Sequence, residues 1–94
     1  MSNTLTSFNR TFYFYLEVGK PLGKRASNLY QFRDVLKTVD IRSIEFHLYR
    51  EDFEKWLRFI GVNPLASDLE RIRKDGLRGE LLREKICDAV DKRL

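Results

Sequence analysis

The chain has 94 residues, of which 43% are hydrophobic and 34% are charged, and its formal net charge is +4. This length supplies one modest hydrophobic core, so we expect a single folded domain. The longest apolar run, Phe12–Leu16, is too short to span a membrane, and the single cysteine excludes an intrachain disulfide. We therefore expect a cytoplasmic protein without a membrane segment, and the dense charge is typical of thermophilic proteins.

The first part of the chain is predicted to be extended rather than helical. Residues 1–10 are polar and are expected to form a flexible lead-in. Apolar side chains then alternate with others over about residues 11–18, a pattern that is typical of a strand. The next stretch, residues 19–23, contains two glycines and a proline and is predicted to be a loop.

No second alternating run follows this extended segment, so it lacks an obvious strand partner in the chain. Such a segment either packs across the helices as a strap or pairs with the same segment of a second chain. We favour the strap, with Phe12, Phe14 and Leu16 packed on the helices, because alternating apolar residues can cover a helical face without a partner. This interpretation predicts a monomer rather than a strand-paired dimer.

Helical periodicity dominates the rest of the chain. Helix starts are indicated at Asn28, Asp40 and Asn63, and the last helix is expected from Glu80 to Leu94. Residues 11–94 are therefore predicted to form one all-α domain. It is a small bundle of four to five short helices behind the N-terminal extended segment at about residues 11–18.

The largest apolar side chains gather in residues 46–60, where they follow the spacing of one helical stripe: Phe46, Tyr49, Phe53, Trp56, Leu57 and Ile60. The stripe allows one long helix over this region. Alternatively, two helices meet near residue 51, and Asp52 begins the second helix as its N-cap. We favour the break, because Ile44 and Leu48 lie on a different helical face from Phe53.

Four residues near this break are candidates for chemistry or for holding the fold together: His47, Arg50, Asp52 and Trp56. His47 and Glu51 are four residues apart, a spacing that suits a metal site or acid–base catalysis. The chain has no other histidine, so a closed set of metal ligands is missing. Cys87 would need a positioned base to act as a nucleophile, and nothing in the sequence places one beside it. We therefore expect a structural junction beside the aromatic core, and no enzyme.

Basic residues concentrate in the first third of the chain. Residues 1–33 contain five basic residues and one acidic residue, whereas the remainder has thirteen of each. The candidate patch for nucleic acid or another anion consists of Arg10, Lys20, Lys24, Arg25 and Arg33. Because Tyr13 and Tyr15 stand near these groups, phosphates could bind the cations while bases stack on the rings. No standard nucleic-acid motif accompanies the patch.

The last predicted helix carries an acidic stripe: Glu80, Glu84, Asp88 and Asp91. At helical spacing these carboxylates lie opposite the apolar face and are exposed to solvent. A calcium ion would relieve their mutual repulsion, but carboxylates on one helix cannot surround an ion. The sequence therefore predicts at most weak calcium binding at millimolar concentration, with ordinary surface charge as the alternative.

A motif lies at the centre of the chain: His47-x-x-Arg50-x-Asp52-Phe53-x-x-Trp56-Leu57. It is accompanied by Phe12-x-Phe14, Ala26-x-x-Leu29, Leu65-Ala66, Gly79-x-x-Leu82 and Val90-x-x-Arg93-Leu94. In these motifs the chain resembles an uncharacterised archaeal family, a domain of unknown function that is found alone or joined to larger chains. The resemblance covers most of residues 12–94 and implies no activity, cofactor or catalytic residue.

Taken together, the sequence favours a non-catalytic helical interaction module whose partner is another protein. Two alternatives of a different class stay open. One is nucleic-acid binding through the basic first third, and the other is weak divalent-cation binding through the last helix. No cofactor is expected apart from weakly bound calcium.

Overall fold

The fold is that of a computed structural model, in which residues 10–94 are described. Apart from Arg10, the flexible lead-in expected for residues 1–10 lies outside the described residues. The described chain forms two strands and five helices: β1 (Phe12–Glu17), β2 (Lys20–Ala26), α2 (Leu29–Thr38), α3 (Ile41–Tyr49), α4 (Asp52–Phe59), α5 (Asn63–Lys74) and α6 (Gly79–Arg93).

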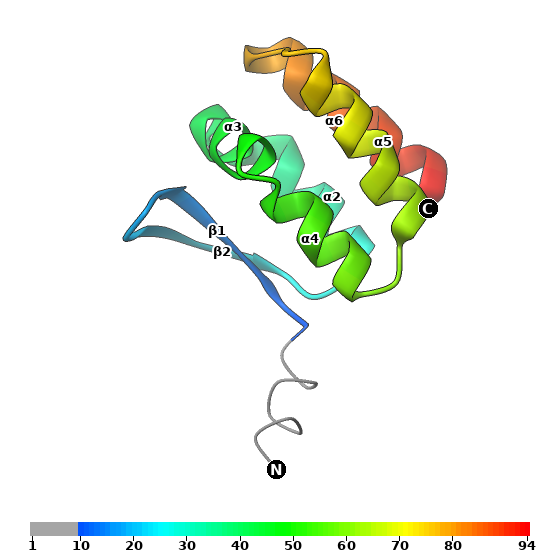
Figure 1. Cartoon of the computed structure of the whole chain (residues 1–94). Coiled ribbons are helices and arrows are strands. Elements are labelled where there is room, and N and C mark those ends of the chain that lie inside the picture. Colours follow the sequence, from blue (N-terminus) through cyan, green and yellow to red (C-terminus); the bar gives the residue numbers. More distant parts are fainter. Residues whose placement is uncertain (1–9) are drawn as a thin grey trace.

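The elements are arranged in three layers, as Figure 1 shows. The β1–β2 hairpin forms the first layer, and it packs through β1 on α3 and through β2 on α2. Helices α2, α3 and α4 form the middle layer, and α5 and α6 cover the side away from the hairpin. None of the helices in residues 10–94 is long and apolar enough to cross a membrane.

The expectation of an all-α domain is right for the helices and wrong for the N-terminal segment, which forms a two-stranded antiparallel sheet. The predicted loop, residues 19–23, is instead the turn and the first part of β2. Gly19 makes the turn at a φ of 79°, a left-handed conformation that glycine adopts without strain. The strand was missed because Lys-Pro-Leu-Gly-Lys-Arg-Ala shows little apolar alternation, and β1 beside it provides the pairing.

The inner face of β1 packs on the helices as a strap would. Phe12 and Phe14 are buried, as predicted, whereas Leu16 is only half-buried. On the outer face, Tyr13 is 48% exposed and lies directly opposite Arg25 of β2. The idea of a strand without a partner in its own chain is therefore wrong, and the monomer stays a prediction.

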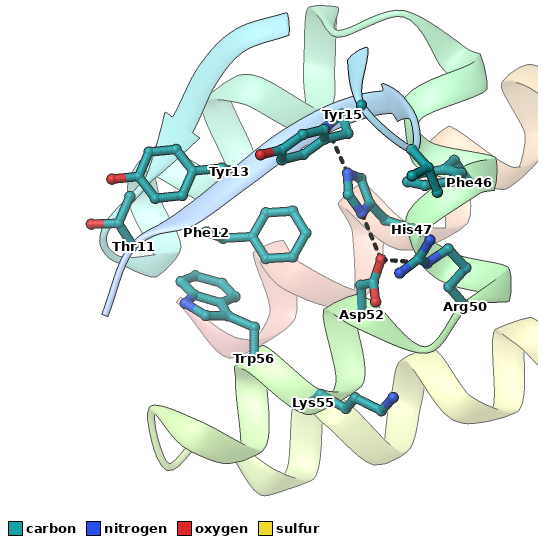
Figure 2. A pocket seen from close by; sticks show the side chains of 12 residues that line it. Thr11, Phe12, Tyr13, Tyr15, Phe46, His47, Arg50, Asp52, Lys55 and Trp56 are labelled. Atoms are coloured by element: carbon teal, nitrogen blue, oxygen red, sulfur yellow. Dashed lines mark hydrogen bonds and ion pairs between the residues drawn. The ribbon is translucent and has the colours of Figure 1, made fainter. Parts of the chain in front are cut away.

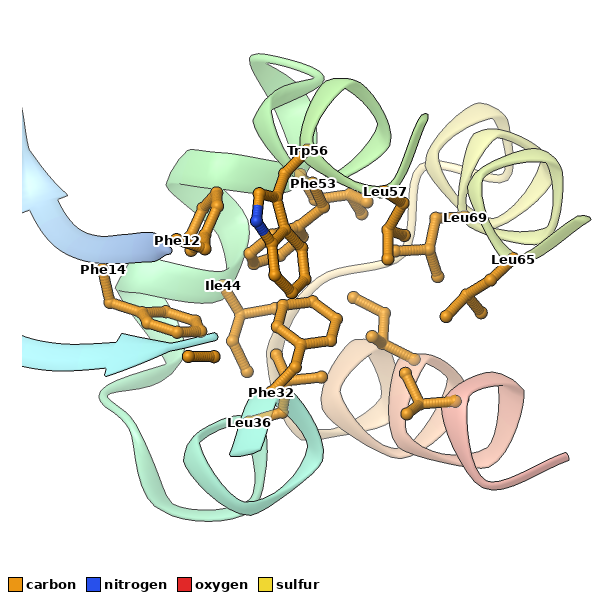
Figure 3. Close-up of a cluster of buried hydrophobic side chains, with 14 of the residues drawn as sticks. Phe12, Phe14, Phe32, Leu36, Ile44, Phe53, Trp56, Leu57, Leu65 and Leu69 are labelled. Atoms are coloured by element: carbon orange, nitrogen blue, oxygen red, sulfur yellow. The ribbon is translucent and has the colours of Figure 1, made fainter. Parts of the chain in front are cut away.

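An aromatic cluster joins the hairpin to the helices, and Figure 3 shows it beside the aliphatic core. The Trp56 ring centroid lies 5.1 Å from that of Phe32 and 5.6 Å from that of Phe12. Phe53 is fully buried, and its ring centroid lies 5.2 Å from that of Phe32. Aromatic pairs of this kind add about 0.5–1.5 kcal/mol each beyond the burial of their surface. The hairpin and the helices α2 and α4 consequently share one core.

Side-chain caps fix the starts of the first two helices. The Asn28 side chain accepts a hydrogen bond from the Gln31 backbone N–H at 2.9 Å, and Asp40 accepts one from the Arg42 backbone N–H at 2.9 Å. Both predicted starts are confirmed. The last two helices each begin one residue before the prediction, so that α5 starts with Asn63 inside the helix and α6 starts at Gly79.

The favoured break in residues 46–60 is present, because α3 and α4 are separate helices. Glu51 makes the turn with a φ of 67°, a left-handed conformation that is uncommon for a residue with a Cβ. The prediction that Asp52 is the N-cap of the second helix is wrong. Glu51 holds the N-cap position, and the Asp52 carboxylate binds His47 instead. Of the predicted stripe, Phe53, Trp56 and Leu57 are buried, whereas Phe46, Tyr49 and Ile60 are half-buried.

The start of α6 is held by side chains of α3. The Gly79 backbone N–H donates to Glu45 Oε2 at 2.8 Å, and the Tyr49 hydroxyl donates to the Leu77 carbonyl oxygen at 2.5 Å. The Arg78 guanidinium lies 4.3 Å from the centroid of the Tyr49 ring, a cation–π contact. Arg78 itself occupies the N-cap position without a side-chain cap bond. Helix α6 is therefore capped by tertiary contacts.

Candidate functional site: a pocket beside strand β1

A pocket of about 440 Å³ lies between β1 and the junction of α3 with α4. Its lining consists of Thr11, Phe12, Tyr13, Tyr15, Val18, Gly19, Phe46, His47, Arg50, Asp52, Lys55 and Trp56. Figure 2 shows the strand residues Tyr13 and Tyr15 on one side, and Asp52, Lys55 and Trp56 on the helical side. The volume falls within the range of ligand pockets, roughly 300–1,000 Å³.

His47 of α3 connects the two sides of the pocket. Its side chain is buried, and the Tyr15 backbone N–H of β1 donates to its Nε2 at 2.8 Å. Because Nε2 accepts, the proton of the neutral ring sits on Nδ1, which donates to Asp52 Oδ2 at 2.9 Å. Both ring nitrogens are therefore occupied, and His47 acts as a bridge between β1 and α4.

The surroundings of His47 favour its neutral form. Burial lowers the pKa of His47 below its ordinary value of 6.5, and this outweighs the opposite effect of the Asp52 carboxylate. The nearby Arg50 guanidinium lowers the pKa of His47 further. The neutral ring is also what the strand requires, because a protonated Nε2 could not accept the Tyr15 N–H.

The Asp52 carboxylate links the residues of the predicted junction. Its Oδ2 binds His47 and also lies 3.2 Å from Arg50 Nε. The Arg50 guanidinium in turn lies 4.8 Å from the centroid of the Phe46 ring, a cation–π contact. The structure thus brings His47, Arg50 and Asp52 into one network, with Trp56 on the same pocket lining.

Lys55 contributes a positive charge without a counter-ion to the pocket. It is exposed on α4 and forms none of the ion pairs found among residues 10–94. The charge of Arg50, in contrast, is shared with Asp52. The lining therefore combines aromatic surface with one free ammonium group. Such a combination suits a ligand that has an apolar body and an anionic group.

Arg10, which the sequence analysis assigned to the anion patch, makes two contacts with α4 and the residue that follows it. Its backbone carbonyl oxygen accepts the indole N–H of Trp56 at 2.9 Å. Its guanidinium donates to the carbonyl oxygen of Ile60, just after α4, at 3.1 Å. Both contacts hold the residue before β1 against α4, so Arg10 has a structural role.

The other four residues of the predicted patch divide into two pairs. Lys20 and Arg33 are engaged with acidic side chains, at 2.8 Å for Lys20 and at 3.4 Å and 3.7 Å for Arg33. Lys24 and Arg25 are exposed on β2, and Arg25 lies across from Tyr13. Of the proposed anion surface, the structure therefore brings only Arg25 directly beside Tyr13, because Lys24 lies opposite the buried Phe14.

The acidic residues predicted for calcium are all exposed on α6: Glu80, Glu84, Asp88 and Asp91. The first carboxylate pairs with Arg83 at 2.7 Å, and the last lies 3.7 Å from Arg33 of α2. Within residues 10–94, no three His, Cys, Asp or Glu side chains converge as a metal ion would require. Calcium binding by α6 stays a prediction, and it has no preformed site among these residues.

The residues considered for catalysis are His47, Glu51 and Cys87, and the structure shows the surroundings of each. His47 has both nitrogens occupied, and Glu51 is exposed at the turn before α4, so the two do not form a metal-binding pair. Burial raises the pKa of the Cys87 thiol, which disfavours the reactive thiolate.

The sequence analysis named Tyr13 and Tyr15 as stacking surfaces for nucleic acid, but it did not connect them with the α3–α4 junction, and it did not single out Lys55. The tyrosines were recognisable because they occupy the side of an alternating segment that faces away from the core. Aromatic residues on that side are worth attention as a binding surface, since large exposed apolar groups mark interaction sites when they cluster. The proximity of residues 11–19 to residues 46–56 could not be read from spacing, because tertiary packing creates it.

The fold and the pocket define a small helical domain with an N-terminal hairpin and a site of ligand size. No known protein family, curated protein or solved structure matches the chain. The archaeal family resemblance stays an interpretation of the motif around His47.

Proposed function

We propose that this protein is a non-catalytic interaction module that holds an extended segment of a protein partner in the pocket beside β1. The observation that carries this proposal is the composition of the lining, which joins aromatic surface to the unpaired ammonium group of Lys55. An apolar side chain of the partner would occupy the aromatic surface. A neighbouring carboxylate of the partner would bind Lys55.

The test is an amide-resolved NMR titration of the full chain with the peptide Ac-Glu-Val-Phe-Val-Glu-NH2. We expect saturable shifts at residues 11–19 and 46–56, which come together only in the pocket. A matched peptide with lysines in place of the glutamates should bind more weakly. The absence of saturable shifts at millimolar peptide, or shifts confined to α5 and α6, would contradict the proposal.

A charge-reversal pair sharpens this test. Lys55→Glu should weaken peptide binding by about fivefold to tenfold, since a charge pair at the rim contributes about 1 kcal/mol. Lys92→Glu is the matched control, because Lys92 is exposed on α6 and lies outside the pocket lining. Equal effects of the two substitutions would show that only the net charge of the protein matters.

A second candidate function is binding of single-stranded nucleic acid by the outer face of the hairpin. One observation favours it, namely that Tyr13 and Arg25 lie opposite each other on the outer face, with Lys24 exposed next to Arg25 in the chain. The same NMR titration with an octamer of uridine tests it. Shifts at Lys24 and Arg25 that weaken steeply with salt, together with no response to the peptide, would favour this function.

A further inference from the structure

We infer that the bound segment pairs backbone to backbone with Tyr13 and becomes a third strand beside β1. The inference rests on the proposed function and adds how the segment is held. The ligand that we infer is an extended peptide with an apolar side chain between acidic ones. Three observations on the free edge of β1 lead to it.

The first observation is the direction of the backbone groups of β1. Tyr15 lies opposite Pro21, which has no N–H, and its own N–H donates to His47 on the side away from β2. Residues two apart on a strand present their N–H and C=O groups to the same edge. The extra residues of the irregularity between Phe14 and Tyr15 lie on β2, so β1 runs regularly from Phe12 to Tyr15. The N–H and C=O of Tyr13 therefore face the pocket edge.

The second observation is that side chains occupy the edge on both sides of Tyr13. His47 takes the N–H of Tyr15 at 2.8 Å, and the Trp56 indole takes the C=O of Arg10 at 2.9 Å. A strand edge with a long row of free backbone groups invites pairing between copies of a protein. Here side chains already take the Tyr15 N–H and the Arg10 C=O, so the open stretch of edge around Tyr13 is short, which suits one short partner segment.

The third observation is the position of the pocket relative to this free part. In an antiparallel pair, the residue opposite Tyr13 exchanges both backbone hydrogen bonds with it and points its side chain to the same outer face. The next residue of the segment points to the inner face, where Phe12, His47 and Trp56 line the pocket. An apolar side chain at that position enters the pocket, and a following carboxylate can reach Lys55.

N-methylated peptides test the inference directly. In Ac-Glu-Val-Phe-Val-Glu-NH2, phenylalanine fills the pocket, so its own N–H points away from β1. We expect N-methylation of phenylalanine to leave the affinity unchanged within a factor of about two, and N-methylation of one of the two valines to lower it about tenfold. Amide exchange gives a second readout. Saturation with the peptide should slow exchange of the Tyr13 N–H, while the Tyr15 N–H is already protected by His47.

A pair of variants gives an independent check. Tyr13→Ala removes the ring and keeps the N–H, whereas Tyr13→Pro removes both and suits an edge strand. The proline variant should bind the peptide more weakly than the alanine variant. If the proline variant does not fold, the N-methylated peptides decide the question with the unchanged chain.

The outcomes separate this inference from the proposed function. Peptide binding that is insensitive to valine N-methylation and leaves Tyr13 unprotected would overturn strand addition and keep peptide recognition. No saturable binding of the peptide would overturn both. A concentration-dependent dimer that sedimentation detects and Tyr13→Pro abolishes would mean that a second copy occupies the edge, which would also overturn the inference.

Discussion

His47 is the residue on which the contacts around the pocket converge. Its ring centroid lies 4.8 Å from that of Phe12 and 5.0 Å from that of Phe46, and its nitrogens bind β1 and α4. The only histidine of the chain is thus a structural bridge that depends on its protonation state. A sequence reading can find such a residue but cannot tell which groups will occupy its nitrogens, because Tyr15 is 32 residues away in the chain.

The pH dependence of stability tests this role of His47. Its pKa in the folded state is lowered from 6.5, so the unfolded state binds more protons between these two pKa values. The stabilising contribution of the neutral ring is complete above about pH 6.5 and is lost as the pH falls towards the folded-state pKa. We expect the unfolding free energy, measured with urea, to decrease by at most about 1.4 kcal/mol per pH unit in this window.

The control for this measurement is His47→Gln, which cannot gain a proton in that range. Its unfolding free energy should be lower than that of the wild type at pH 7.5, and it should change less between pH 6.5 and pH 5. Parallel pH curves for the two proteins would assign the acid sensitivity to the carboxylates instead.

At the scale of single elements, the turn between α3 and α4 sets the geometry of the pocket. Glu51 holds a left-handed backbone conformation at a φ of 67°, for which a side chain is unfavourable. Glu51→Gly should therefore raise the unfolding free energy by about 0.5–1 kcal/mol, after the larger flexibility of glycine in the unfolded chain is offset. The urea midpoint of the variant measures this gain.

Glu51→Ala is the matched control, because alanine removes the carboxylate and keeps the Cβ. It should show no gain in stability. If alanine and glycine stabilise the protein equally, removal of the charge rather than relief of the backbone is responsible.

The elements differ in how far the sequence could predict them. The helix starts at Asn28 and Asp40 were predictable, because a side-chain cap is a local interaction within a few residues. Strand β2 was not, because its pairing comes from β1 and not from its own alternation. The assignment of Asp52 as an N-cap followed its local sequence signal. The tertiary contact of its carboxylate with His47 overrides that signal in the structure.

At the scale of the whole molecule, the hairpin and the helices should unfold together. Trp56 lies at their interface, where its ring packs near Phe12 of β1 and Phe32 of α2. Trp56 fluorescence therefore reports on hairpin packing, whereas far-UV circular dichroism reports mainly on the helices. We expect the two signals to give the same urea midpoint and slope, because one shared core makes a small domain cooperative.

A fluorescence transition at clearly lower urea would show that the hairpin separates before the helices unfold. In that case the pocket would be lost while the helical bundle remained. The peptide titration with the same samples would detect this, since binding would disappear with the fluorescence signal.

The candidate site was less predictable than the fold, and the reason is its construction. Half of the pocket comes from β1 and the following turn, and the other half comes from the α3–α4 junction. The sequence pointed to the junction through His47 and Asp52. The sequence did not indicate that the junction lies close to Tyr13. It also did not indicate that Arg10 binds the Ile60 carbonyl oxygen.

The capping of α6 by α3 has a consequence for α6 in isolation. The Gly79 N–H finds its acceptor in Glu45, which precedes it by 34 residues, and the local N-cap Arg78 supplies no side-chain bond. A short helix without a local cap is marginal in water. A synthetic fragment of residues 77–94, which lacks α3, should therefore be largely unstructured, and far-UV circular dichroism of the fragment measures this.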